Sequence, residues 1–131
     1  MSPTPDEQEL IDAASAARAN AYAPFSEYKV GAAVRDDRGR VTAGANVENS
    51  SYGLTICAER VAIGAAVAAG AKRIVAAAVV TDGAAAPCGA CRQFLFELGP
   101  DCRVLLVGAD GAVRSARTIG ELLPDGFRLA R

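Results

Sequence analysis

The spacing of apolar residues predicts a helix near the start of the chain. Thr4, Pro5 and Glu7 are typical of a helix start, with Thr4 as the cap, Pro5 in the first turn and Glu7 reaching back to the cap. The apolar side chains that follow recur every three or four positions, as they do on one face of a helix. Pro24 is expected to end this helix. Its apolar positions are Leu10, Ile11, Ala14, Ala17 and Ala21.

Short apolar runs predict the strands. Residues 30–34 and 41–47 flank the sequence Asp-Asp-Arg-Gly at 36–39, which predicts a hairpin. Residues 74–80 are continuously apolar, which is typical of a strand covered on both faces, and residues 103–107 form a similar run. One more strand is expected between that run and the last helix.

Three further segments are expected to be helical, because each ends at or before a glycine or a proline. They are the alanine-rich residues 57–70, residues 91–98 and residues 118–123. The predicted order of elements is α-β-β-α-β-α-β-β-α. Since alternating elements of this kind pack as layers, the sequence predicts an α/β fold with a mixed sheet.

Composition and charge narrow the class of protein. The chain has 131 residues, 51% hydrophobic and 22% charged, which is typical of one globular domain, expected over residues 1–131. The net charge is −1 and no basic patch stands out, so we expect a small-molecule partner and no nucleic acid. No apolar run reaches the roughly 18 residues of a membrane span. The first ten residues carry acids where a signal peptide has bases, so the expected location is the cytoplasm.

Histidine is absent from the sequence, which contains four cysteines. Mechanisms that need an imidazole base, such as Ser-His and Cys-His pairs, are therefore excluded within this chain. Acid–base work must fall to carboxylates, lysine, tyrosine, cysteine or water. Without an export signal, the cysteines are expected to be thiols or metal ligands and not disulfides.

Two cysteine clusters carry the candidate chemistry. The sequence TICAER places Cys57 two positions before Glu59, and PCGACRQ places Cys88 and Cys91 in a C-x-x-C spacing. Each cluster is predicted to open a helix, whose N-terminus carries partial positive charge and stabilises thiolates. Two such helix ends meeting at one point would assemble three thiolates around a zinc ion.

Three protein ligands leave zinc a fourth position for water, the catalytic arrangement, and Glu59 would sit over that position to move protons. Arg60 and Arg92, each beside a cluster, are candidates for hydrogen bonds to the sulfurs that offset their negative charge. The joint pattern of a first ligand, a glutamate two residues later and P-C-x-x-C is the signature of zinc deaminases, with cysteine here in place of histidine.

The sequence resembles the cytidine deaminases of the small homotetrameric type, which use three cysteines and no histidine. The resemblance covers most of the chain, from Ala21 to Phe127, and is carried by YAPFSEYKVGAAV, NVENSSYGLTICAER, APCGACRQ and ELLPDGF. It implies a three-layer α/β/α fold with a mixed five-stranded sheet. It also implies a nucleoside substrate and a homotetramer whose sites are shared between subunits.

The resemblance further implies a reaction. This is the zinc-dependent hydrolytic deamination of cytidine and deoxycytidine to uridine and deoxyuridine, with release of ammonia, in pyrimidine salvage. One zinc ion per chain would be held by Cys57, Cys88 and Cys91. Glu59 would shuttle protons by protonating the ring nitrogen, activating water for attack at C4 and delivering a proton to the leaving ammonia.

Other residues are assigned to the substrate by the same resemblance. Asn46 and Glu48 would hold the ribose hydroxyls, and their alternate positions on a strand point them the same way. Tyr28 stands where the family usually has a phenylalanine that stacks on the base, so an aromatic face is kept. The remaining implied roles are a backbone contact from Ala58, Tyr52 and Phe127 in a neighbouring subunit's site, and Gln93 near the zinc.

Three other readings remain open. A structural zinc module would use all four cysteines, although Cys102 is expected to be a small buried residue of a strand. A redox protein would use Cys88 and Cys91 as a dithiol. A deaminase of another cytosine compound would act on a nucleoside antibiotic or a polynucleotide, and the absence of a basic channel counts against the polynucleotide.

Overall fold

The computed structural model describes residues 2–130, whose elements follow the predicted order. These elements are α1 (Pro5–Arg18), β1 (Gly31–Asp36), β2 (Val41–Ala45), the 3-10 helix η1 (Tyr52–Leu54), α2 (Ala58–Ala68), β3 (Ile74–Thr81), α3 (Gly89–Leu98), β4 (Arg103–Gly108), β5 (Val113–Thr118) and α4 (Ile119–Leu122). The prediction of a further strand before the last helix is confirmed by β5. Within residues 2–130, every helix is too short or too polar to cross a membrane.

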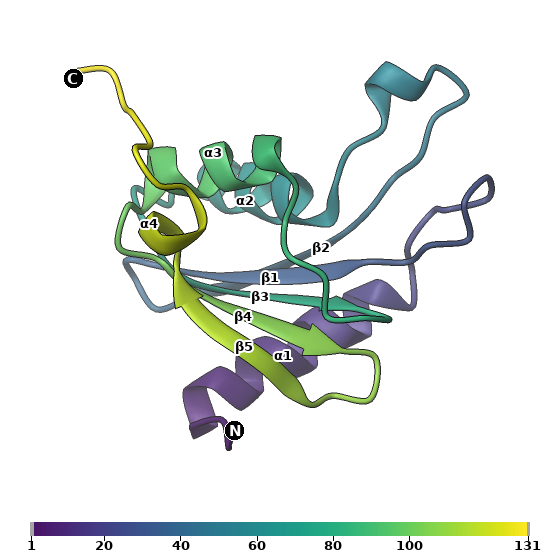
Figure 1. The fold of residues 1–131 in the computed structure, drawn as a ribbon, viewed down its shortest axis with the longest axis horizontal. Helices are drawn as coiled ribbons and strands as arrows, with labels where there is room; N and C mark the ends of the chain where they lie inside the picture. Colours follow the sequence, from purple (N-terminus) through teal and green to yellow (C-terminus); the bar gives the residue numbers. More distant parts are fainter. Residues whose placement is uncertain (1, 131) are drawn as a thin grey trace.

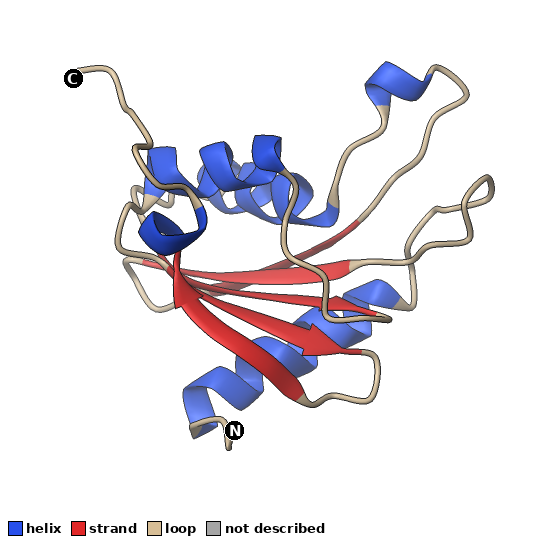
Figure 2. Ribbon diagram, in the orientation of Figure 1, coloured by secondary structure: helices blue, strands red, loops and turns tan. Residues whose placement is uncertain are grey.

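The strands form a mixed sheet in the order β2-β1-β3-β4-β5. Strands β3 and β4 run parallel and are joined through α3, whereas the other neighbouring pairs run antiparallel. Helix α1 covers one face of this sheet, and α2, α3 and α4 lie over the other (Figures 1 and 2). The predicted three-layer α/β/α fold with a mixed five-stranded sheet is therefore confirmed.

Helix α1 starts as predicted but ends earlier. The Thr4 hydroxyl accepts a hydrogen bond from the backbone N–H of Glu7, whose carboxylate accepts one from the backbone N–H of Thr4. The expectation that Pro24 ends the helix is wrong, because the helix ends at Arg18. Past that point the chain leaves the helix so that Tyr22 can pair with Val47 as an isolated bridge.

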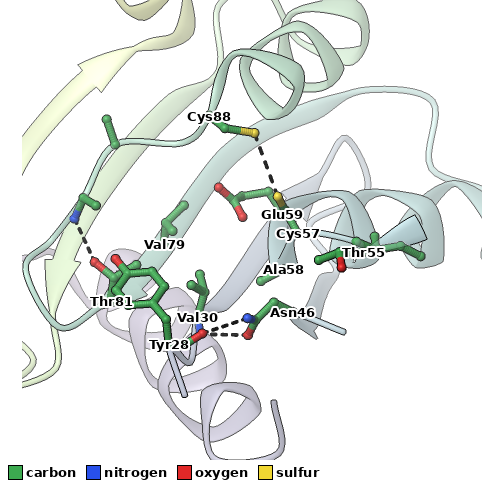
Figure 3. A pocket seen from close by; sticks show the side chains of 13 residues that line it. Tyr28, Val30, Asn46, Thr55, Cys57, Ala58, Glu59, Val79, Thr81 and Cys88 are labelled. Atoms are coloured by element: carbon green, nitrogen blue, oxygen red, sulfur yellow. Dashed lines mark hydrogen bonds between the residues drawn. The ribbon is translucent and has the colours of Figure 1, made fainter. Parts of the chain in front are cut away.

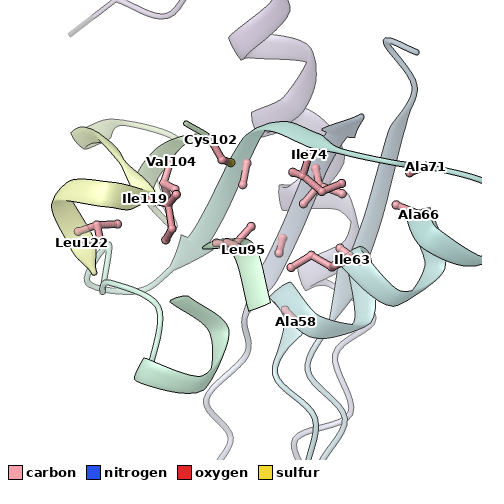
Figure 4. Packing of buried hydrophobic residues seen from close by; sticks show 14 of the residues in the cluster. Ala58, Ile63, Ala66, Ala71, Ile74, Leu95, Cys102, Val104, Ile119 and Leu122 are labelled. Carbon is pink, nitrogen blue, oxygen red and sulfur yellow. The ribbon is translucent and has the colours of Figure 1, made fainter. Parts of the chain in front are cut away.

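Two hydrophobic clusters lie on the two faces of the sheet. The first, between the sheet and α1, is made of Leu10, Ile11, Ala14, Ala33, Ala78, Val80, Leu105 and Val107. The second lies between the sheet and α2, α3 and α4, and includes Ile63, Ile74, Leu95, Val104 and Ile119 (Figure 4). Cys102 belongs to this second cluster and is 1% exposed, so its prediction as a small buried residue is confirmed.

Close packing fixes α2 against the sheet. Gly44 lies on β2, where a side chain would come within 2.6 Å of the Ala62 backbone nitrogen and 2.8 Å of the Ala58 carbonyl oxygen. Only a residue without Cβ allows this approach of helix to strand. The N-terminal end of α2, which follows Cys57 directly, is thereby held over the strand that leads to Asn46.

Candidate active site

Three thiols from two helix ends meet at one point. Cys57 is the N-cap residue of α2, Cys88 is the N-cap residue of α3, and Cys91 lies in the first turn of α3. The sulfur of Cys88 is 3.9 Å from that of Cys57 and 3.5 Å from that of Cys91. Among residues 2–130 these three sulfurs form a group that could hold one metal ion, and Cys102 lies outside it.

The donor set suits zinc. Four-coordinate zinc with sulfur at about 2.3 Å sets its tetrahedral ligands roughly 3.8 Å apart, close to the sulfur–sulfur distances of the cluster. A hydrogen bond from the Cys91 thiol, with further ones from Arg60 and Cys88, lowers the pKa of Cys57 to about 5. The site therefore already favours a thiolate, which is the form of cysteine that binds metal.

The two candidate arginines differ in position. Arg60 donates from Nη2 to the Cys57 sulfur over 3.5 Å, as predicted. The expectation for Arg92 is wrong, because its guanidinium donates to the carbonyls of Pro87 at 2.8 Å and Leu122 at 2.6 Å. Arg92 instead ties the chain before Cys88 to the end of α4, since its side chain reaches both carbonyls from α3.

Glu59 is buried close to the three sulfurs. It occupies the first turn of α2, is 5% exposed and points into a cavity of about 230 Å³ (Figure 3). Burial raises the pKa of its carboxyl group, and the nearby charge of Cys57 adds to this rise. A buried carboxyl group that takes up a proton readily can act as a general acid as well as a base.

The same cavity collects six of the predicted site residues. Its lining includes Tyr28, Asn46, Cys57, Ala58, Glu59 and Cys88. Seven further lining residues carried no signal in the sequence analysis, being Val30, Thr55, Ile56, Val79, Thr81, Ala85 and Ala86. Most of them are small apolar residues of loops and strand ends, whose place in a cavity depends on how those ends converge.

Two of these residues are polar, the partly buried Thr55 and the fully buried Thr81. Thr81 has a structural role that can be read directly. It is 3% exposed, and its hydroxyl accepts a hydrogen bond of 2.7 Å from the Ala85 backbone N–H. This bond fixes the turn that leads from β3 to Cys88 (Figure 3). Its position directly after the apolar run 74–80 is a signal that could have pointed to the strand end.

Asn46 and Glu48 hold the loop that carries Tyr28. The Asn46 side chain accepts a bond of 2.9 Å from the Val30 N–H and donates one of 2.8 Å to the Tyr28 carbonyl. The Glu48 carboxylate accepts from the N–H groups of Phe25 and Ser26 and from the Ser26 hydroxyl. Glu48 lies outside the first cavity, in a neighbouring hollow of about 410 Å³. Thr55 lines both spaces.

The three remaining predicted residues are not among the described residues that line the cavity. Tyr52 is 82% exposed on η1, which stands on a loop that projects from the body, and lines the same hollow as Glu48 (Figure 1). Phe127 is 68% exposed in the last segment of the chain. Gln93 donates from its amide to the Phe127 carbonyl over 3.2 Å, so it contacts the C-terminal segment.

Known proteins resemble this chain in both sequence and fold. Residues 4–107 match the family model described as cytidine and deoxycytidylate deaminase zinc-binding region. The cytidine deaminase of Halalkalibacterium halodurans is 48% identical over 93% of this chain and 94% of that protein, and that of Mycobacterium tuberculosis is 49% identical over 88% and 85%. The crystal structure of cytidine deaminase from Burkholderia pseudomallei superposes with a TM-score of 0.85 at 52% identity, covering 91% of this chain and 97% of that one. The chain therefore belongs to the zinc-dependent cytidine and deoxycytidylate deaminase family.

Proposed function

We propose that the chain hydrolyses the amino group of cytidine and deoxycytidine, giving uridine or deoxyuridine and ammonia, in pyrimidine salvage. The observation that carries this proposal is the buried Glu59 carboxyl group, which points into a cavity edged by the thiols of Cys57 and Cys88. A metal site alone requires no such acid, whereas a hydrolytic deamination must move protons between water, ring and leaving group.

The residues divide the work of this reaction. Cys57, Cys88 and Cys91 hold the zinc, which when bound acts as a Lewis acid and makes water a nucleophile at neutral pH. Glu59 takes the proton of the attacking water and passes it to the ring nitrogen. The water oxygen forms the new bond to C4. Glu59 then takes the second proton from the hydroxyl group on C4 and delivers it to the amino group, which leaves as ammonia when the carbon–nitrogen bond breaks and the C4 carbonyl forms.

The substrate contacts are limited by the hydrogen bonds that already exist. Each carboxylate oxygen can accept two hydrogen bonds, and a side-chain amide can accept two at its oxygen and donate two from its nitrogen. In Asn46, one N–H and one lone-pair direction of the carbonyl oxygen remain for a ligand. In Glu48, Oε1 accepts twice and Oε2 accepts once, so one position is left for a sugar hydroxyl. Tyr28 offers a ring to the base, and Ala58 offers its backbone.

The charge of the site favours a nucleoside over a nucleotide. The residues 2–130 that line the cavity and the hollow beside it include no lysine or arginine. The hydrogen bond from the Ser26 hydroxyl, together with those from two backbone N–H groups, holds the pKa of Glu48 below its usual value. Glu48 is therefore an anion at neutral pH, and it would repel the phosphate of deoxycytidylate.

We further propose a homotetramer whose sites are shared. The cavity of about 230 Å³ is smaller than the roughly 300–1,000 Å³ of usual ligand sites, so a single chain encloses too little of a nucleoside. Tyr52 and Phe127 are large, exposed and carried on projecting segments, which suits a role in a neighbour's site. The outer side of α2 is uncharged and exposed at Gly64, Ala65, Val67 and Ala68, which suits contact with another copy.

A cytoplasmic location is proposed with this function. The four cysteines, all described, are free thiols and not disulfides, which is typical of a reducing compartment. Thiol ligands must stay reduced to bind zinc, so the site itself favours such a location.

Wild type and Glu59→Gln, both loaded with zinc, test the proposal with cytidine, deoxycytidine and deoxycytidylate as substrates. Ultraviolet absorbance should show that wild type converts both nucleosides and leaves the nucleotide largely unchanged. Glu59→Gln should keep its zinc and lose at least about 1,000-fold in kcat, because general acid–base groups contribute factors of this order. Normal turnover by Glu59→Gln would refute the proton-shuttle role.

A deaminase of another cytosine nucleoside, such as a nucleoside antibiotic, is the alternative. It is favoured by Tyr28, whose phenol adds a polar group to the cavity at the place where the resemblance implies a phenylalanine. A faster rate with such a nucleoside than with cytidine, measured side by side, would support this alternative.

A further inference from the structure

The loop of residues 25–30 is bound to the chain after β2 by side-chain hydrogen bonds. Glu48 binds its first part and Asn46 binds its second part. The two residues that the proposed function assigns to the sugar are therefore also the residues that hold the loop carrying Tyr28. Any group that fixes the direction of the Glu48 carboxylate also fixes its one free acceptor position.

Ser26 is placed to set that direction. Its backbone N–H donates to Oε1 of Glu48 over 3.2 Å, and its hydroxyl donates to Oε2 of the same carboxylate. The hydroxyl oxygen also accepts a bond of 3.0 Å from the Tyr28 backbone N–H. Because the Tyr28 N–H points at a lone pair of the Ser26 hydroxyl oxygen, the hydroxyl proton is directed to Glu48. The carboxylate is thus held at both oxygens by one residue.

The backbone around Ser26 is strained. Glu27, the next residue, has a φ of 59°, a left-handed conformation that glutamate rarely adopts. Such a conformation persists where the surrounding contacts over-determine it. Here the contacts are the bonds to Glu48 on one side and the bond from the Glu27 N–H to the Ala23 carbonyl at 2.9 Å on the other. A turn that is held by this many hydrogen bonds is suited to fixing the position of the Ser26 hydroxyl group.

We propose that Ser26 is a positioning residue for sugar recognition, whose hydroxyl orients the Glu48 carboxylate toward the hydroxyl groups of the nucleoside. This inference rests on the proposed function, since it needs a nucleoside in the site. It assigns Ser26 no contact with the reacting atoms. Its effect should appear in the discrimination between substrates with and without sugar hydroxyls, and not in the chemistry at the base.

The test compares cytidine with 2′,3′-dideoxycytidine, which lacks both hydroxyls that Glu48 could bind. We expect Ser26→Ala to lower the ratio of kcat/KM for cytidine to that for dideoxycytidine by about tenfold, since hydrogen bonds to charged groups are worth factors of this order or more. The kcat/KM of Ser26→Ala for dideoxycytidine itself should fall by less than about threefold relative to wild type. Ser26→Thr, which keeps the hydroxyl, should restore the ratio, and Ser115→Ala on β5 is the matched control.

Each outcome decides the matter. An equal loss with both substrates would show that Ser26 only supports the loop, and an unchanged ratio would show that Glu48 needs no help; either result overturns the inference. A Ser26→Thr variant as defective as Ser26→Ala would overturn it as well. Zinc content and the unfolding midpoint, compared with Ser115→Ala, show whether Ser26→Ala is folded. If wild type converts neither nucleoside, the proposed function falls first and the role of Ser26 falls with it.

Discussion

Two cysteines of the chain, Cys57 and Cys102, lie in opposite surroundings. Cys57 begins a helix and receives hydrogen bonds from Cys91 and Arg60, which lower its pKa. Cys102 packs among apolar side chains beneath α4, and burial raises the pKa of its thiol to about 12. A thiol of the first kind is ready to bind metal, whereas one of the second kind stays protonated and inert.

These two thiols form a matched pair for a test of the metal site. Cys57→Ala removes one of three ligands, so we expect zinc affinity to fall by more than about 100-fold, the upper end of what loss of an outer partner costs. Cys102→Ala should keep about one zinc per chain and lose about 1 kcal/mol of the free energy of unfolding. Metal analysis after dialysis measures the first effect, and chemical denaturation measures the second. Full zinc retention by Cys57→Ala would contradict the three-thiol site.

At the scale of elements, the site depends on how closely α2 approaches β2. Gly44 lies against the backbone of the first two turns of this helix, next to Ala58 and Ala62. The same turns carry Glu59 and follow Cys57, so a shift of the helix would move the carboxyl group and a sulfur together. The backbone of β2 at Gly44 therefore sets the distance between α2 and the sheet.

Gly44→Ala tests this dependence. Its added methyl group would meet backbone atoms at 2.6 and 2.8 Å, which cannot give way as a flexible side chain would. We expect a loss of about 1–3 kcal/mol in the free energy of unfolding, together with reduced zinc content and activity. Gly120→Ala in α4 is the control, because the nearest contact of its added methyl group would be the Pro100 carbonyl oxygen at 3.8 Å. Equal stability of the two variants would show that α2 has room to move.

In the molecule as a whole, the four most exposed large apolar side chains of residues 2–130 lie on two segments that stand away from the sheet. Tyr52 and Leu54 belong to η1, and Phe127 and Leu129 belong to the C-terminal segment, all of them more than half exposed. Figure 1 shows both segments extending beyond the helical layer. Exposed apolar surface of this kind is typical of an interaction site, and the proposed homotetramer would cover it.

The proposed sharing of sites between subunits predicts that two inactive variants can rescue each other. Tyr52→Ala would spoil a neighbour's site, and Glu59→Gln would spoil the site of its own chain. When the two are co-expressed, about a quarter of the sites in a randomly mixed tetramer would combine an intact Glu59 with an intact Tyr52. We therefore expect partial recovery of cytidine turnover by the mixture.

Glu59→Gln co-expressed with Cys57→Ala is the control for this experiment. Both substitutions fall in the site of the same chain, so no arrangement of subunits restores a complete site. Light scattering should give the mass of a tetramer for each preparation. Active monomers, or recovery in the control as large as in the test, would argue against the sharing of sites.

The sequence predicted the order and type of the elements because apolar spacing and helix starts are local properties. The capping box at Thr4 and the strands from Ile74 and Arg103 appear where the pattern placed them. The end of the first helix was missed, since the pairing of Tyr22 with Val47 joins segments far apart in the chain. The extent of the domain over residues 1–131 and the roles of the individual site residues stay predictions.

The residue types alone limit the chemistry that the chain can carry out. Without histidine, a C-x-x-C pair and a third cysteine beside Glu59 leave few other uses for these groups. The tertiary structure decided which groups meet. It brought Arg60 to the Cys57 sulfur and Arg92 to two backbone carbonyls, although each arginine stands within three positions of a cysteine in the chain. It also joined Ser26 to Glu48 across 22 positions. Such choices depend on the packing of helices on the sheet, which brings together residues whose spacing in the sequence carries no trace of their contact.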